Sequence, residues 1–512
     1  MRRSALLSKS KPRLQISEPT GFASPVGGLN YRDPLASMPK TDAIRMFNIY
    51  PRGNYVEVRA GCSNYATGMS GTASTMALHS GMNGVETVFC STNSGIYDVT
   101  SSGAVGASVL SRTNGKHQWV NYGDGTNNWL IMVNGVNKPA YYNGSAWTAV
   151  DGATTPAITG VTTTALIGVC VYQGRLFFIQ DGTLKLWYLP SGVVGGAATA
   201  FDLSTQAARG GYLMAAMNWT FDGGSGSKDH IAFVTSMGEV IVYAGTDPST
   251  AADWVKIGTY YIGKPIGRQC MCKYGGDLLV LTEDGVIALS GALSGVVNES
   301  KYKLSDKIRN RYILLAKTFG SLYGWQILVY PKENALIVNV PTVEDTGSAQ
   351  LVMNSQTGAW AEFTNWNTNS FCLYNKSLYG CIGTKTVLFW SGTSDAASSQ
   401  TGISAEFATA FTNLGENVFK DIKAIRFQTS GNTSNALVQI GISDKISAGA
   451  LPTNLTAQTV LANTVNTTWF NPPSYGGTWI SAYFLNDQTT QGGLLQVNSV
   501  EYLYEKGSIT SV

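Results

Sequence analysis

The feature that most constrains the fold of this chain is a β-hairpin pattern that recurs along residues 86–390. Each copy has a run of aliphatic and β-branched residues, a turn that contains Gly, Asn or Asp, and a second such run, as a hairpin requires. Seven copies align on apolar anchor residues 42 to 58 positions apart, namely Val88, Leu130, Leu176, Ile231, Leu278, Leu336 and Leu378. Because a propeller blade takes about 40–50 residues, the pattern predicts a β-propeller of six or seven blades with insertions in the longer repeats.

The extent of this pattern divides the chain into three parts. Residues 55–392 hold the predicted propeller, and the alternating stretch Tyr55–Arg59 is a candidate for the strand that closes the ring. Residues 391–402 are small and polar, which indicates a domain boundary. Residues 393–512 read as the alternating strands of an appended, jelly-roll-like β-sandwich. Residues 1–54 are then an N-terminal arm and lead-in, with a helical turn expected over residues 42–48. The predicted fold class is all-β.

One insertion differs in kind, because residues 301–319 carry the pattern of an amphipathic helix. Ser305 can cap it, and one face is apolar through Leu304, Ile308, Tyr312, Leu315 and Phe319. The basic residues of the insertion are Lys301, Lys303, Lys307, Arg309, Arg311 and Lys317. Two interpretations stay open: the helix packs on its own blade with a solvated charged face, or it contacts DNA or a partner. On the second interpretation, charge reversal impairs assembly or DNA retention more than folding.

The N-terminus is also basic, through Arg2, Arg3, Lys9, Lys11 and Arg13. It is either a flexible solvated tail or an arm that reaches a neighbouring subunit or a phosphate backbone. The net charge of +3 is too small to indicate a nucleic-acid binder by itself. No long apolar segment follows the basic residues, so we expect no signal peptide and no membrane span. The 7 Cys are an odd number, and no signal peptide for secretion is expected. Together these observations favour free, mostly buried thiols in a reducing cytosol.

Motifs for a bound metal or nucleotide are incomplete. Cys270 and Cys272 have no second pair of ligands, and the three His are far apart, at His79, His117 and His230. The stretch Gly258–Pro265 looks like a phosphate loop, but Pro265 stands where the Mg²⁺-binding Ser or Thr would be. We therefore expect no metal and no cofactor.

Catalytic carboxylates are not indicated either. A glycosidase needs two carboxylates flanking one bond. The candidate acids stand in turn-forming contexts, where they stabilise the backbone: Asp222, Asp229, Glu283 and Asp284. The low charged fraction of 13% and the 57 Gly are typical of a turn-rich all-β protein. The sequence therefore predicts a protein that is not an enzyme.

The stretch from Trp219 to Ser290 contains two of the hairpins and also carries a family resemblance. The resemblance lies in four segments: Phe221–Val240, Tyr243–Pro248, Ile262–Arg268 and Gly275–Val286. They resemble a region of the tail nozzle, or packaged-DNA-stabilisation protein, of short-tailed bacteriophages, a phage tail hub propeller family. The likeness is clear over about residues 160–345 and vague elsewhere.

This resemblance implies a structural virion protein. Members of the family assemble as a ring, usually of six copies, at the distal end of a short tail. The ring docks on tail adaptor proteins and neighbours tail fibres or spikes. Double-stranded DNA passes through its lumen, and its closed tip retains the packaged genome. The expected location is the virion tail, after assembly in the host cytoplasm. No catalytic residues are carried over.

Two other functions stay open at this stage. One is a propeller-based receptor- or glycan-binding tail protein, which would show an aromatic-rimmed pocket. The other is a hydrolase of surface polysaccharide, which would need an acidic pair in a cleft.

Overall fold

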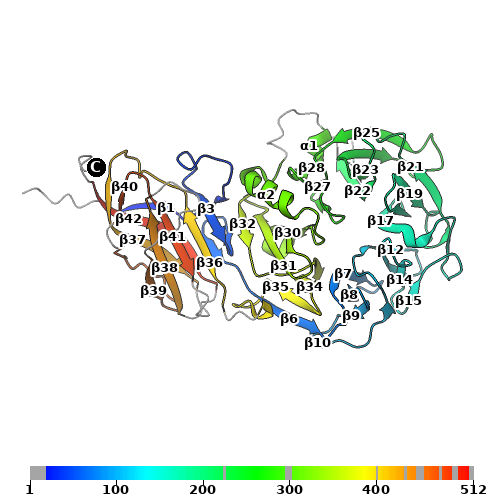
Figure 1. Ribbon diagram of the computed structural model, residues 1–512, viewed down its shortest axis with the longest axis horizontal. Coiled ribbons are helices and arrows are strands. Elements are labelled where there is room, and N and C mark those ends of the chain that lie inside the picture. Colours follow the sequence, from blue (N-terminus) through cyan, green and yellow to red (C-terminus); the bar gives the residue numbers. More distant parts are fainter. Residues whose placement is uncertain are drawn as a thin grey trace, which may run out of the picture.

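The protein consists of two β-rich bodies that lie side by side (Figure 1). The computed structural model describes residues 19–222, 227–293, 303–398, 402–431, 435–444, 452, 455–471, 475–486 and 494–506. One body is a ring of small sheets around an axis, and the other is a pair of packed sheets. This confirms the predicted all-β class with a propeller and a sandwich.

The described strands of the ring form seven blades, each an antiparallel sheet whose first strand lies nearest the axis. The first three blades are β7–β9 with β11 (Ala73–Ser80, Glu86–Thr92, Gly95–Asp98, Leu110–Ser111), β12–β15 (Gln118–Gly123, Asn128–Val133, Ala140–Tyr142, Trp147–Ala149) and β17–β19 with β21 (Leu166–Tyr172, Arg175–Gln180, Lys185–Tyr188, Thr199–Asp202). Blades four and five are β22–β25 (Leu213–Asp222, Ser227–Thr235, Glu239–Ala244, Val255–Tyr261) and β26–β28 (Met271–Tyr274, Asp277–Thr282, Gly285–Ala288). The last two are β29–β32 (Gln326–Tyr330, Ala335–Val343, Gly347–Asn354, Trp360–Phe363) and β33–β35 with β6 (Ser370–Tyr374, Ser377–Ile382, Lys385–Phe389, Cys62–Thr67).

The seven hairpins predicted from sequence are the second and third strands of the seven blades. Their anchor residues are buried, with exposed fractions of at most 1%. This agreement has a simple cause, because the two middle strands of a blade are covered on both faces by the neighbouring blades. Their apolar runs are therefore the strongest local signal in each repeat.

The ring is closed by β6, which pairs antiparallel with β35 as the outermost strand of the last blade. This pairing of an N-terminal strand with the last hairpin sets the blade number at seven. The predicted closing strand was wrong: Val56–Val58 (β5) pairs instead with β4 (Ile49–Pro51) and with β42 (Gln496–Lys506) of the sandwich. Both stretches have strand character, and only the long-range pairing distinguishes them.

The sandwich has the strand order of a jelly roll. One sheet runs β5-β42-β37-β40, with β1 (Thr20–Ala23) beside β5 on the same edge of β42. The other runs β3-β36-β41-β38-β39. The remaining bounds are Asp42–Phe47 (β3), Ala405–Thr409 (β36), Lys420–Ser430 (β37), Ala436–Ser443 (β38), Thr456–Val460 (β39), Tyr475–Gly477 (β40) and Ser481–Asn486 (β41). Strand β3 is added at the edge of the second sheet, and the other eight positions are those of a jelly roll, filled by strands from both ends of the chain.

The sandwich is therefore discontinuous, and the propeller is inserted between β5 and β36. Residues 20–58, predicted as mainly an arm and lead-in, supply strands to both sheets. The helical turn expected over residues 42–48 is also wrong, because this segment is β3. Ala43, Ile44 and Met46 are all buried there, and the strand pairs antiparallel with β36.

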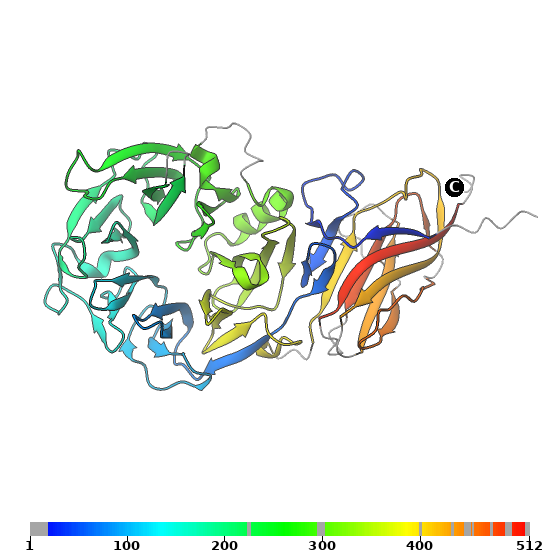
Figure 2. The same cartoon turned by 180° about the vertical axis from the view of Figure 1, so that it is seen from behind.

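The two bodies share one sheet. Strand β3 of the sandwich lies parallel to β32 of the sixth blade, with Phe47 opposite Glu362. This contact makes a ten-stranded sheet that runs from β29 in the propeller to β39 in the sandwich. Figure 2 shows the same continuity from behind. A shared sheet makes a stiffer connection than a flexible linker.

The predicted amphipathic helix is present, in part as a 3₁₀ turn. Asp306–Ile308 forms the turn (η3), and α2 spans Arg309–Phe319. The predicted apolar face is buried at Ile308, Tyr312 and Leu315. Ser305 makes no side-chain cap; its Oγ accepts a hydrogen bond from the Val286 amide. No helix in the described part of the chain is long and apolar enough to span a membrane.

Candidate functional site

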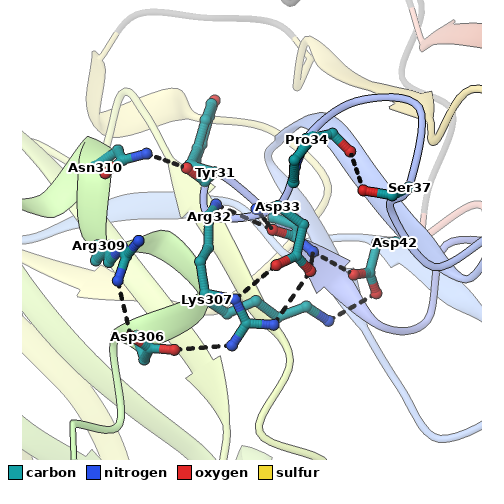
Figure 3. Close-up of polar contacts among 11 residues, drawn as sticks. Tyr31, Arg32, Asp33, Pro34, Ser37, Asp42, Asp306, Lys307, Arg309 and Asn310 are labelled. Carbon is teal, nitrogen blue, oxygen red and sulfur yellow. Dashed lines mark hydrogen bonds and ion pairs between the residues drawn. The ribbon is translucent and has the colours of Figure 1, made fainter. Parts of the chain in front are cut away.

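The basic residues of the predicted helix were the first candidates for a functional surface, and the structure places two of them in internal ion pairs. Lys307 donates to Asp42 Oδ1 at 2.7 Å (Figure 3). It also donates to the Gly27 carbonyl at 2.7 Å. Arg311 makes two hydrogen bonds, of 2.6 and 3.0 Å, to the Glu362 carboxylate, which is 2% exposed. The hydrogen bonds that Arg311 donates to Glu362 raise the pKa of Arg311.

The loop before β3 docks on the same helix (Figure 3). Arg32 donates to Asp306 at 2.8 Å, and Asn310 donates to the Tyr31 carbonyl at 2.6 Å. Arg32 also bonds to Asp33 and thereby lowers the pKa of that carboxyl to about 2. Helix α2 and this loop are therefore an interdomain clamp, which we define by residues 30–42 and 306–311.

The other candidate basic residues are placed differently. Arg309 and Lys317 are exposed, and Arg309 lies 3.9 Å from Asp306. Lys303 is half-buried in a bridge with Ile287. Lys301, Arg2 and Arg3 lie outside the described residues. The candidates that the structure describes are thus not brought together on one surface.

The ion pair between Arg311 and Glu362 leads to a prediction that separates a structural role of Arg311 from a role on the surface. Replacing Arg311 with Met should lower the free energy of unfolding by about 2 kcal/mol, because it leaves the Glu362 carboxylate buried without its partner. Amide hydrogen exchange should also increase along β3 and β32. The matched control is Lys317→Met on the exposed face of the same helix, which should change neither quantity. Equal behaviour of the two variants would refute the structural role of Arg311.

A second candidate site lies on the propeller axis, where the inner strands converge. Two adjoining cavities, of about 500 and about 200 Å³, share four lining residues: Gln118, Met214, Arg268 and Gln269. The larger cavity opens beside Lys116, Tyr212 and Glu344, and the smaller one continues along inner-strand residues. We call the two cavities together the axial funnel.

The charged groups of the axial funnel are paired. Lys116 Nζ lies 2.7 Å from Glu344 Oε1, and Arg268 donates to Asp181 Oδ1 at 2.8 Å. Arg268 also donates to the Leu213 carbonyl, and burial lowers its pKa. The funnel is therefore polar but electrically balanced.

The inner strands of blades six and seven are tied together beside the funnel. The Gln326 amide accepts from the Phe371 backbone N–H at 2.6 Å and donates to the Phe371 carbonyl at 3.0 Å. These two hydrogen bonds imitate the backbone pairing of adjacent strands and hold blades six and seven together beside the funnel.

The other chemical candidates are dispersed by the fold. His79 contacts the Asn128 carbonyl at 2.8 Å in the first two blades, and burial lowers the pKa of His117 to about 3. No group of three or more potential metal ligands occurs among the described residues. All seven Cys lie in the described part and are free, and six of them are buried, as the sequence predicted.

Sequence analysis did not single out the funnel residues. Gln118 and Gln326 begin inner strands, and Tyr212 precedes one, but these strands have weak local patterns. Position in the repeat could have indicated them. The inner strand of each blade comes just before the predicted hairpin, so the residues that precede each hairpin are candidates for the lining of the axis.

Comparisons with known proteins add fold likeness alone. No family model matches the sequence, and no curated protein matches it. Similar solved structures include YCF48 bound to D1 peptide, with 10% identity, a TM-score of 0.38, and coverage of 69% of this chain and 98% of that one. A putative 6-phosphogluconolactonase from Bacteroides uniformis has 15% identity and a TM-score of 0.34, with coverage of 60% of this chain and 88% of that one. An exo-β-1,3-galactanase from Phanerochaete chrysosporium has 8% identity and a TM-score of 0.27, with coverage of 75% of this chain and 95% of that one. These values support no argument about function.

Proposed function

We propose that this protein is a structural subunit of the distal nozzle ring of a phage tail, which conducts DNA during ejection and helps to retain the packaged genome. It acts as a scaffold and not as an enzyme. The proposal starts from the resemblance over residues 160–345, which span blades three to five, the helix of the clamp and the first two strands of blade six. The shared ten-stranded sheet supports it, since a rigid ring needs subunits whose domains do not hinge.

The observation that carries the proposal is the outer strand of the fourth blade. Strand β25 exposes three large apolar side chains, Val255 (49%), Ile257 (47%) and Tyr261 (53%). It is the last strand of its sheet, and among the described residues no strand pairs with its free edge. Figure 1 shows it on the outer rim of the ring of blades. A long apolar edge strand is normally covered, so a second copy of this chain is the proposed occupant.

The lumen of the proposed ring lies between copies and not along the axis of one propeller. The axial funnel is narrowed to a cavity of about 200 Å³. The major groove of duplex DNA is by itself about 12 Å wide, and the whole duplex is wider than its groove. A duplex therefore does not fit into a cavity of about 200 Å³. A conduit should also hold DNA weakly, because each phosphate contact adds salt-sensitive affinity. The net charge of +3 suits this role.

The remaining partners follow from the same proposal. We propose a homo-oligomer of six copies in the virion tail, assembled in the host cytoplasm, in contact with tail adaptor proteins and with fibres or spikes. Arg309 and Lys317 are exposed and stay candidates for contact with DNA or a partner. Lys301, Arg2 and Arg3 stay candidates on sequence grounds. Lys307 is better explained by the clamp, and Arg311 by its ion pair with Glu362 inside the propeller.

Mass photometry tests the proposal directly. The protein, mixed with its tail adaptor, should form a ring-sized particle, and Ile257→Lys should reduce that species at least tenfold because it buries a charge in the contact. Val343→Lys is the control, since Val343 is 58% exposed on a different blade. A particle that stays monomeric with the adaptor present would contradict the proposal. So would a ring that forms equally well from the Ile257→Lys variant.

A further inference from the structure

The axial funnel contains polar groups that the fold leaves unused. Gln118 and Gln269 line both of its cavities and are half-buried. Neither side-chain amide has a hydrogen-bond partner among the described residues, whereas the oxygen and the nitrogen of the neighbouring Gln326 amide are both bonded to Phe371. Unpaired amides in a partly enclosed site favour a ligand that supplies both donors and acceptors.

The charges around these amides argue against an ionic ligand. Lys116 is paired with Glu344, and Arg268 with Asp181. Because each of these charges already has a partner of opposite sign, the funnel offers no uncompensated charge that would attract an anion or a cation. A neutral, hydroxyl-rich ligand leaves both pairs intact.

An aromatic side chain stands at the opening of the larger cavity. Tyr212 is 38% exposed there, and the Arg268 guanidinium lies 5.8 Å from its ring centroid. A sugar ring has an apolar C–H face that packs on such a side chain and hydroxyls that bond to amides. The cavity volume of about 500 Å³ is within the usual range of small-molecule sites.

We propose that the axial funnel binds a neutral sugar residue, a hexose or an N-acetylhexosamine, of a surface glycan. The Gln118 and Gln269 amides would bond to its hydroxyls, and Tyr212 would cover its apolar face. This site goes beyond the nozzle role and does not depend on it, because the funnel is complete within one chain. Failure of ring assembly would leave the sugar test unaffected, and the reverse also holds.

Saturation-transfer NMR and calorimetry on the full chain test the site. The probes are D-glucose, D-galactose and N-acetyl-D-glucosamine, with N-acetylated triglycine amide, called triglycine amide below, as a neutral polar probe that is not a sugar. At least one sugar should bind saturably and triglycine amide should not. Gln118→Ala, Gln269→Ala and Tyr212→Ala should each weaken sugar binding about five- to tenfold.

The control is Gln356→Ala, which removes an amide from an exposed turn of the sixth blade and should leave sugar binding unchanged. The urea midpoint of each variant shows whether it is folded, and Tyr212→Ala tests the site through a partly exposed residue if a glutamine variant unfolds. The proposal is overturned if no sugar binds, if triglycine amide binds in place of the sugars, or if the funnel variants bind like Gln356→Ala.

Discussion

Replacing Asp395 with alanine is expected to lower the free energy of unfolding by about 3–5 kcal/mol. Asp395 and Arg59 are both fully buried, and two hydrogen bonds of 2.7 and 2.8 Å join the carboxylate to the guanidinium. Arg59 also donates to Asn48 Oδ1 and to the Thr364 carbonyl. Without the carboxylate, the guanidinium stays held in the interior as an uncompensated charge.

Because this ion pair lies at the junction of the two bodies, its loss should destabilise both of them. Arg59 lies between the last N-terminal strand of the sandwich and the closing strand of the ring, and Asp395 follows the last blade. Urea denaturation followed by tryptophan fluorescence measures the loss. Lys423→Ala, which breaks an exposed ion pair with Asp421 on the sandwich, should leave the midpoint almost unchanged. If the Asp395 variant were as stable as that control, the pair would have no role in joining the two bodies.

The stability of the protein should also fall as the medium becomes acidic, because of His117. This side chain is 1% exposed, and burial lowers its pKa from the usual 6.5 to about 3. Its Nε2 lies 3.2 Å from the Asn134 amide nitrogen, an arrangement that fits the neutral ring. Between these two pKa values the unfolded chain binds a proton that the folded chain does not.

The sign and size of this effect follow from proton linkage. Above about pH 6.5 the group has no influence, and below it the free energy of unfolding decreases by about 1.4 kcal/mol per pH unit until about pH 3. Denaturation curves between pH 7 and pH 4 should show this slope in the parent protein. In the His117→Gln variant, the dependence of the free energy of unfolding on pH should be smaller by about 1.4 kcal/mol per pH unit in this range. An unchanged slope in that variant would contradict the assignment.

The hairpins show how far local pattern reaches. The two middle strands of each blade are covered on both faces, so their residues must be apolar whatever the rest of the chain does. All seven anchors, from Val88 to Leu378, are buried as predicted. The helix at 309–319 was found for the same reason, since its periodic face packs at Tyr312 and Leu315.

The errors have a common origin in long-range pairing. Residues 49–58 and 62–67 have similar strand character, yet the first joins the sandwich and the second closes the ring. The basic residues Lys307 and Arg311 look like a free charged face until the partners Asp42 and Glu362 are placed beside them. Those partners are 265 and 51 residues away in the chain.

The sequence by itself determined the class of this protein, the repeat and its hairpins, and the buried thiols. These are local properties, because periodicity and turn chemistry act over a few residues. Only the tertiary structure decided the blade number, the discontinuous jelly roll, the clamp and the axial funnel. Each of these depends on which distant segments meet, and that is set by the packing of the whole chain, which no short pattern encodes.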